Sequence, residues 1–317
     1  MNLLDRLPSG SRIAVIRLRS LGDCVLSTPA LSLLKGHRPD LKLSIIVEPR
    51  FAEIFADNPD IDETRDSMTH ADLVLNLHGG TRSMILTALS RAKFRVGFAH
   101  HRYRFVYSHK IPTAQEILGV SRRVHTAEHL ASAMFWLGVP QQEIPRARLF
   151  VADPPPSRRP YAVIHPFAAR PDKTWPAERF IEVAHHLNLE PVFLAGPTDD
   201  LTPFENFQTS RESLAVTKNL IAGASLFIGN DSGPAHIAAA FGVPVVVLFG
   251  QSDSVTWAPW RTESKVLTSP AAIAGISAHR VTAAIESLNL FHPAALPNSA
   301  LPTTGALPSR DRRERRP

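Results

Sequence analysis

The stretch FIGNDSGPAHIAAAFGVPVVVLFG, residues 227–250, decides the fold. It joins the apolar run SLFIG (225–229) to the helix-like PAHIAAAF (234–241) and then to the β-branched run VPVVVLF (243–249). Strand, helix and strand follow one another here. Strands that are apolar throughout, without alternation, are typical of parallel sheets covered by helices on both faces. The stretch therefore predicts an α/β unit.

The same alternation extends outward to both ends of the chain. In the second half we expect further strands at 161–165 and 191–195 and helices at 176–187 and 277–290. In the first half we expect strands at 12–18, 41–47, 72–77 and 94–98 and, among the helices, 81–91 and 125–138. The chain therefore reads as two consecutive α/β units.

A proline-rich break, DPPPSRRP at 153–160, separates the two units, because it can continue neither a helix nor a central strand. We therefore predict an N-terminal domain over 1–152 and a C-terminal domain over 161–290. The remaining segment, 291–317, is rich in proline and arginine and has no hydrophobic period, so we expect it to be disordered.

Length and composition agree with two soluble domains: 317 residues, 44% hydrophobic and 20% charged. Cys24 is the only cysteine, which excludes a disulfide framework and a zinc site of clustered thiolates. No signal-peptide pattern and no long uncharged apolar window is present, so we expect a cytoplasmic protein that does not span the membrane.

Charge is divided unevenly. Residues 1–150 hold 20 Lys and Arg against 14 Asp and Glu, a net of +6, and residues 151–317 hold 15 of each. The excess positive charge of the first half would attract anionic partners of any kind. An equal alternative is that this charge only keeps the protein soluble.

The segment DSGPAH, residues 231–236, is a helix start that suits an anion. Asp231 or Ser232 can cap the helix, Gly233 keeps the backbone open, and Pro234 suits the first helical position. Helix N-termini at the ends of parallel strands bind phosphates, and His236 in the first turn could add a donor to a pyrophosphate. The alternative is an ordinary capped helix with a packed histidine.

Lys173 lies in the polar loop RPDK, directly before Trp175 and a proline. Its ammonium group is a point charge that suits phosphate. A solvated loop lysine is the alternative. We expect Trp175 to anchor the core.

Asp23 closes the loop RSLGD (19–23) between the first strand and its helix, where α/β sheets place ligands. The alternative is that Asp23 only caps the helix. Arg17, Arg19 and Ser20 flank it and could hold an anionic acceptor, although solvated charges at the end of a strand are equally compatible.

Three stretches together resemble the pattern of glycosyltransferase family 9, the lipopolysaccharide heptosyltransferases. They are RLRSLGDCVLSTPAL (17–31), HPFAARPDKTWPAERF (165–180) and the block from FIGNDSGPAH to FGQSD (227–253), and the match runs from about Arg12 to Leu290. The resemblance implies the GT-B architecture, two Rossmann-like domains that face a central cleft. It also implies Asp23 as the general base and Lys173 as a phosphate ligand in a donor site with Asp231, Ser232, Gly233 and His236.

The chain departs from the family pattern between residues 196 and 231, where nucleoside contacts normally fall. Asp199, Asp200 or Glu205 could bind a ribose hydroxyl there, and we assign Asp199 to the donor site. The base of the donor nucleotide stays open.

Basic and aromatic residues alternate from Arg82 to Lys110. The aromatic side chains suit a core, and we expect the charged ones to face an acceptor or a membrane.

We therefore expect an inverting, metal-independent glycosyltransferase without a cofactor. It would move a heptose-type sugar from a nucleotide diphosphate, ADP-heptose by the resemblance, to a lipopolysaccharide core or a related anionic glycolipid. No HExxH spacing indicates a metal, and nucleic acid is not an expected partner. Peripheral contact with the inner face of the cytoplasmic membrane stays open.

Two rival functions are a nucleotide-sugar epimerase of the same architecture and a non-enzymatic protein that binds anionic ligands. A dehydrogenase is disfavoured because no GxGxxG follows the first strand.

Overall fold

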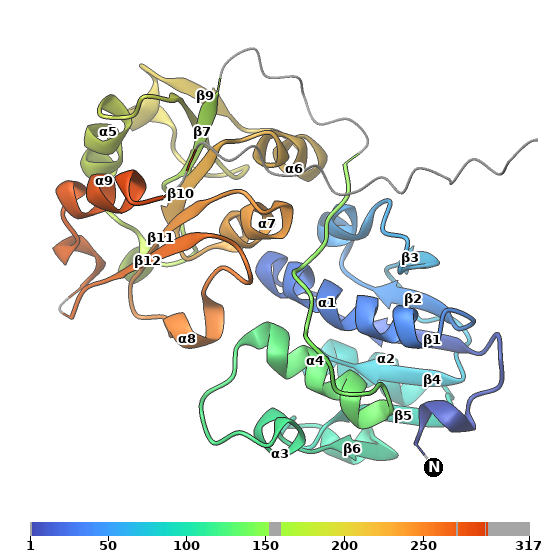
Figure 1. Cartoon of the computed structure of the whole chain (residues 1–317). Coiled ribbons are helices and arrows are strands. Elements are labelled where there is room, and N and C mark those ends of the chain that lie inside the picture. The colour runs from blue at the N-terminus through green and yellow to red at the C-terminus, as the bar shows by residue number, and fades with distance from the viewer. Residues whose placement is uncertain (1, 152–159, 271, 289, 291–317) are drawn as a thin grey trace, which may run out of the picture.

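The computed structural model describes residues 2–151, 160–270, 272–288 and 290, and it arranges them as two α/β halves (Figure 1). The first half is built on a parallel six-stranded sheet with the order β3-β2-β1-β4-β5-β6. Its strands are β1 (Arg12–Ile16), β2 (Lys42–Ile46), β3 (Glu63–Arg65), β4 (Leu73–Asn76), β5 (Phe94–Phe98) and β6 (His109–Ile111).

The second half repeats this plan. Its six parallel strands run in the order β12-β11-β10-β7-β8-β9. They are β7 (Tyr161–His165), β8 (Glu190–Leu194), β9 (Gln208–Ser210), β10 (Leu226–Asn230), β11 (Val245–Phe249) and β12 (Ser264–Thr268). In each half the first and fourth strands are neighbours, so the chain reverses direction across the sheet between them, and ligands bind at such switch points.

Helices cover both sheets (Figure 1). Within the described residues the α-helices are α1 (Leu21–His37), α2 (Thr81–Leu89), α3 (Ala114–Leu118), α4 (Thr126–Leu137), α5 (Ala177–His185), α6 (Leu214–Ala222), α7 (Gly233–Phe241), α8 (Ser254–Trp257) and α9 (Ala278–Glu286). The 3₁₀ turns are η1 (Leu4–Arg6), η2 (Pro49–Phe55), η3 (Arg104–Val106), η4 (Pro171–Lys173), η5 (Thr202–Phe204) and η6 (Ile273–Gly275).

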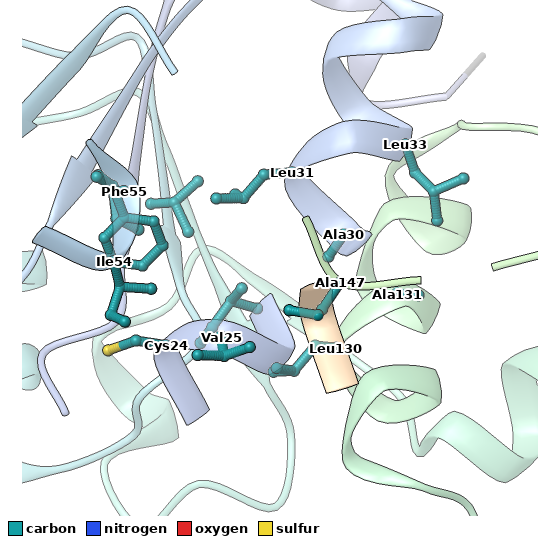
Figure 2. Close-up of a cluster of buried hydrophobic side chains, with 14 of the residues drawn as sticks. Cys24, Val25, Ala30, Leu31, Leu33, Ile54, Phe55, Leu130, Ala131 and Ala147 are labelled. Atoms are coloured by element: carbon teal, nitrogen blue, oxygen red, sulfur yellow. The ribbon is translucent and has the colours of Figure 1, made fainter. Parts of the chain in front are cut away.

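Helix α1 is the central element of the first core. Figure 2 shows Cys24, Val25 and Leu31 of α1 among apolar side chains of η2 and α4, and all three are buried. Pro29 lies inside this helix and has no N–H to give to the Val25 carbonyl. The Thr28 hydroxyl donates to that carbonyl at 2.8 Å, which compensates for the missing donor and keeps the helix continuous past the proline.

Contacts between the halves involve a short segment around α8. Arg123 pairs with Asp253 at 2.9 Å, and the His125 Nε2 lies 2.8 Å from the Ala258 carbonyl oxygen. Trp260 donates from Nε1 to the Pro145 carbonyl at 2.9 Å. The second half is thus tied to the N-terminal half close to the strand ends where a ligand would lie.

The α/β class and the facing Rossmann-like halves are confirmed. The predicted junction at 153–160 falls mostly on residues 152–159, outside the described residues, so the domain bounds stay predictions. The tail at 291–317 also lies outside them. No helix of the described part has both the length and the apolar character that crossing a bilayer requires.

Candidate functional site

The site lies where the switch points of the two sheets face each other. Helix α1 follows β1, α7 follows β10, and the two helices pack together between the halves (Figure 1). Two glycines permit this contact. A Cβ on Gly22 would lie 2.5 Å from the His236 ring, and one on Gly233 would lie 2.5 Å from the Leu21 side chain. A side chain at either position would force the first turns of the two helices apart.

Two cavities open at this contact. The first, which we call the central cavity, has a volume of about 500 Å³ and is lined from both halves. Its lining includes Ser20, Gly22, Asp23, His165, Phe167, Arg170, Lys173, Asp199, Asp231, Ser232, Gly233, Pro234, His236 and Trp257.

The second cavity, the histidine cavity, has about 520 Å³ and lies mainly in the N-terminal half. Its lining includes Arg17, Asp23, His78, His100, His101, Thr113, Gln115, Thr126, His129 and Trp257. Asp23 and Trp257 line both cavities. A larger cavity of about 750 Å³ between α5 and α9 contains none of the predicted site residues in its lining.

Asp23 is held by three donors at the start of α1. One oxygen is paired with the Arg17 guanidinium, and the other accepts from the Ser20 hydroxyl at 3.0 Å and the Ser20 N–H at 3.3 Å. The alternative, in which Asp23 is the N-cap of the helix, is wrong in position: Ser20 is the N-cap, and Asp23 is the third helical residue of a capping box with it. The carboxylate side chain stays 18% exposed, so it can meet a ligand.

The three predicted acceptor residues separate in the structure. Arg17 is buried, lines the histidine cavity and donates to the Leu77 carbonyl at 2.6 Å. Its Nε is buried without a hydrogen-bond partner among the described residues. Ser20 lines the central cavity, whereas the exposed Arg19 lines neither of these cavities. The alternative of a solvated strand-end charge therefore fits Arg19 and does not fit Arg17.

Lys173 reaches the central cavity from η4. Its ammonium group donates to the Asp231 carboxylate at 3.0 Å, and the Ser252 hydroxyl donates to the same oxygen. Asp231 is nearly buried and fixes the lysine at the cavity wall. The alternative of a freely solvated loop lysine is wrong. Trp175 is buried and donates from Nε1 to the Ile276 carbonyl, which confirms that it anchors the core.

The N-terminus of α7 forms another wall of the central cavity. Ser232 occupies the N-cap position without a capping hydrogen bond from its side chain, and its hydroxyl lies 3.1 Å from His165 Nδ1. Gly233, not Pro234, is the first helical residue. Main-chain N–H groups at a helix start lack intrahelical partners and carry the positive end of the helix dipole, so this wall suits an anion.

Two histidines beside this wall are neutral at pH 7. Burial lowers the pKa of His165 to about 4 and that of His236 to about 4, with Asp231 opposing the shift at His236. His236 Nδ1 is buried and has no hydrogen-bond partner among the described residues. His236 is buried, as expected for a packed histidine, and it also lines the central cavity, as expected for a histidine that meets a ligand.

Of the three acidic candidates for the ribose, only Asp199 lines the central cavity. Its carboxylate accepts from the Gly196 N–H at 2.7 Å. Asp200 instead accepts from the Thr202 N–H at 2.9 Å in the same loop. Asp199 is thus the acidic side chain of this loop that the structure places at the central cavity.

We expected the aromatic side chains of the stretch from 82 to 110 to lie in the core, and only some of them do. Phe94, Phe98 and Tyr107 are buried, whereas Phe105 is 73% exposed. Sequence reasoning gave no role to His165, Trp257, His78 or His129, and it included His100 and His101 only as members of the basic stretch from 82 to 110. The signal for His165 was its place at the end of a predicted strand, and the others come from loops and helices that only the fold brings together.

No group of three or more His, Cys, Asp or Glu in the described ranges is placed to hold a metal ion. Burial raises the pKa of the Cys24 thiol to about 12, so this thiol is protonated and unreactive at neutral pH.

Comparisons with known proteins agree on one family. The model of glycosyltransferase family 9 (heptosyltransferase) matches residues 67–284. Lipopolysaccharide heptosyltransferase 3 of Escherichia coli is 28% identical over 77% of this chain and 84% of that protein.

Solved structures show the same fold. A family 9 glycosyltransferase of Veillonella parvula superposes with a TM-score of 0.77, at 23% identity over 87% of this chain and 96% of that one. E. coli heptosyltransferase WaaC, solved with ADP, gives a TM-score of 0.75 at 20% identity over 87% and 99% of the two chains.

Proposed function

The chain belongs to glycosyltransferase family 9, the heptosyltransferases, and from that premise we propose that it transfers a heptose from ADP-heptose to the core of a lipopolysaccharide or a related anionic glycolipid. As a member of this family it is a glycosyltransferase that works with a nucleotide sugar, which speaks against the epimerase and the non-enzymatic binding protein. The donor, the acceptor and the absence of a metal requirement belong to the proposal.

The observation that carries the proposal is the place of Asp23, in the wall between the two cavities. On one side the central cavity offers a helix N-terminus and the ammonium of Lys173. On the other side the histidine cavity lies within the basic N-terminal half. A transferase needs this arrangement, because its base must reach the acceptor hydroxyl while the donor lies close by.

The donor lies in the central cavity in this proposal. Its diphosphate faces the N-terminus of α7 at Ser232 and Gly233, with Lys173 beside it. Asp231 orients the lysine, and His236 adds a neutral imidazole. Asp199 binds the ribose. The presence of ADP in the solved structure of WaaC, a protein of the same fold, supports adenine as the base.

The reaction is a single displacement. The acceptor hydroxyl attacks the anomeric carbon and its proton passes to the Asp23 carboxylate, while the bond from the anomeric carbon to the diphosphate oxygen breaks. Attack opposite to the leaving group inverts the anomeric configuration. The helix amides and Lys173 stabilise the negative charge that develops on the departing diphosphate. In other transferases a metal ion stabilises this charge.

The lipid acceptor stays in its membrane in this proposal, and the enzyme approaches it from the cytoplasmic side. Three of the large exposed apolar side chains support this: Ile85, Leu89 and Phe105 are 47%, 74% and 73% exposed. They lie on α2 and η3, which contact each other. Residues 73–115 around them contain seven Lys and Arg and no Asp or Glu, a combination that suits an anionic bilayer.

The experiment that tests the proposal uses ADP-heptose labelled in the sugar, with and without heptose-deficient lipopolysaccharide. The label should enter the lipid fraction only when enzyme and acceptor are both present, with ADP released in equal amount. Conversion of the free sugar nucleotide to an epimer without acceptor would instead support the epimerase. If neither a labelled lipid nor an epimer is formed, the proposal is contradicted.

A further inference from the structure

Four imidazoles surround the histidine cavity, and three different parts of the first half supply them. His78 follows β4, His100 and His101 follow β5, and His129 lies in α4. The ring centroids of His100 and His101 are 5.0 Å apart, and those of His100 and His129 are 5.3 Å apart. Such a cluster from separate elements is formed only by the folded chain.

The backbone makes room for these rings at two consecutive glycines. Gly79 has a φ of +76°, and a Cβ on it would lie 2.6 Å from the His101 ring. A Cβ on Gly80 would lie 3.2 Å from the His78 ring. His101 Nδ1 is 2.9 Å from the Tyr107 hydroxyl, and the His129 ring stacks on Phe98 with centroids 4.1 Å apart. The imidazoles are therefore held in place before any ligand arrives.

The charges that face the cluster are mostly positive. Arg17 lines the cavity, and Arg19, from the same connection after β1, acts on His78 from outside the lining. Asp23 of α1 is the only carboxylate among the described residues that line the cavity, and it is paired with Arg17. Tyr107 is a titratable group in contact with His101, and burial raises the pKa of its hydroxyl. Arg104 of η3 is a further positive charge close to the cluster, since its Nη1 donates to the carbonyl of Ala99, the residue before His100, at 3.3 Å.

These surroundings keep the imidazoles neutral. Burial, followed by the repulsion from His100, lowers the pKa of His101 to about 3 and that of His129 to about 4. Arg17 contributes to both shifts and has a buried Nε with no partner among the described residues. The cavity thus contains donors and latent positive charge but no anion that would use them, apart from the already paired Asp23.

We propose that the histidine cavity binds an acidic group of the acceptor, a carboxylate or a phosphate carried on a sugar, and that the cluster of His100, His101 and His129 takes up one proton when this group binds. The inference rests on the proposed function, since only that function makes the ligand an acceptor. An acid beside an imidazole favours its protonated form, and the close spacing of the rings opposes a second proton.

Proton uptake has a measurable consequence. Because the free protein holds the imidazoles neutral and the complex holds one protonated, the affinity for the acid must fall as the pH rises. The limit is tenfold per pH unit for one proton. A site made only of permanent charges, such as arginines, would show no such dependence.

Isothermal titration of the full chain with glucuronate, glucose 6-phosphate and uncharged glucose tests the inference. It is run at pH 7 and pH 8, each in two phosphate-free buffers with different heats of ionisation, so that the proton count is obtained directly. The acid that binds identifies the group as a carboxylate or a phosphate. We expect the protein to take up between half a proton and one proton when that acid binds, and the acid to bind three- to tenfold more weakly at pH 8. Glucose should bind at least tenfold more weakly than that acid.

Two variants locate the proton. His101→Gln and His129→Gln each keep a polar side chain, and each should lower the affinity for the acid at least tenfold and reduce the proton uptake. His37→Gln, at the exposed end of α1, is the matched control and should change neither quantity.

ADP is titrated into every sample. Unchanged ADP affinity shows that a variant is folded, and failure of ADP to bind the wild type would count against the proposed donor function alone. Absence of acid binding to the wild type, binding without proton uptake, or full uptake in both folded variants would overturn the histidine inference. If a variant does not fold, the wild-type proton count decides.

Discussion

At the scale of single residues, Lys173 is held by a carboxylate rather than left free in its loop. The Asp231 oxygen that receives its ammonium also accepts from Ser252, so the lysine is fixed before a phosphate binds. In the proposed donor site, removal of the lysine takes away an attraction for the diphosphate and also leaves the Asp231 charge unpaired beside it. Both effects act on the diphosphate and neither acts on the base.

We therefore expect Lys173→Ala to weaken ADP binding by about 10- to 100-fold, the range for a charge-assisted hydrogen bond, and to leave adenosine binding nearly unchanged. Titration calorimetry with both ligands measures this, and Lys42→Ala on the exposed end of β2 is the control. Equal losses for ADP and adenosine would remove Lys173 from the phosphate site.

The sequence identified single site residues better than their partners. Asp23, Lys173 and Ser232 stand out because each lies in, or at the end of, a polar connection between a strand and the helix that follows it. The pairing of Lys173 with Asp231 could not be predicted, because no local pattern records which strand ends become neighbours. Arg17 and Asp23 lie at opposite ends of the connection from β1 to α1, and their pairing depends on how that loop folds. His78 and His129 of the second cavity were missed for the same reason, and His100 and His101 were noted only as part of the basic stretch from 82 to 110.

At the scale of elements, the sequence predicted the strands that lie inside the two sheets and missed those at the edges. Every inner strand of both sheets was predicted, and the missed strands β3, β6, β9 and β12 are the four sheet edges. Inner strands are apolar on both faces and give a strong signal. The edge strand Glu63–Arg65 is exposed throughout, and Gln208–Ser210 nearly so, because edges stay short and polar and resist pairing with other chains.

The contact between α1 and α7 gives a prediction at this scale. Gly22→Ala places a methyl group against the His236 ring, so we expect a loss of about 1–3 kcal/mol in the free energy of unfolding, together with weaker ADP binding. Gly36→Ala, in the last turn of the same helix, meets no atom within 4 Å and should stabilise by up to about 1 kcal/mol.

Urea unfolding of both variants measures the difference. Equal stability of the two would mean that the first turns of α1 and α7 do not need to touch. The same geometry gives Gly233 a second role: a Cβ there would meet the Leu21 side chain, so this glycine also permits the contact between the halves.

At the scale of the whole molecule, burial of neutral histidines makes stability depend on pH. Burial lowers the pKa of His101 to about 3 and those of His129, His165 and His236 to about 4, whereas the unfolded value is about 6.5. The unfolded chain therefore binds more protons between these values. The stabilisation is complete above about pH 6.5 and is lost as the pH falls toward 4.

We expect the free energy of unfolding to drop between pH 6.5 and 5.5, with a slope that approaches about 1.4 kcal/mol per pH unit for each histidine. Carboxylates titrate mainly below this window. Urea unfolding at pH 7.5, 6.5 and 5.5 measures the slope, and a constant free energy over this range would contradict the neutral state of the buried imidazoles.

The exposed apolar side chains on α2 and η3 give a second prediction for the whole molecule. Wild-type protein should sediment with vesicles that contain phosphatidylglycerol and not with pure phosphatidylcholine, and binding should weaken in high salt. The triple variant Ile85→Ser, Leu89→Ser, Phe105→Ser should bind at least about tenfold more weakly, because these side chains lose their transfer into the interface. Val216→Ser with Val255→Ser, exposed in the second half, is the control. Equal vesicle binding by the triple variant would place the membrane contact elsewhere.

In the proposed function the two halves carry separate tasks that meet at Asp23, and the variant Asp23→Asn tests this claim most directly. Asparagine keeps the size of the side chain and can still accept from Ser20, but it loses the pairing with Arg17, so some loss of stability is expected and the assay must run well below the melting temperature. Asp62→Asn, which removes another paired carboxylate far from both cavities, is the control. With saturating ADP-heptose and acceptor, the account predicts that turnover falls by about 10²- to 10⁴-fold in the Asp23 variant while ADP affinity stays within about threefold of the wild type. Wild-type turnover by a folded Asp23→Asn protein would contradict the account.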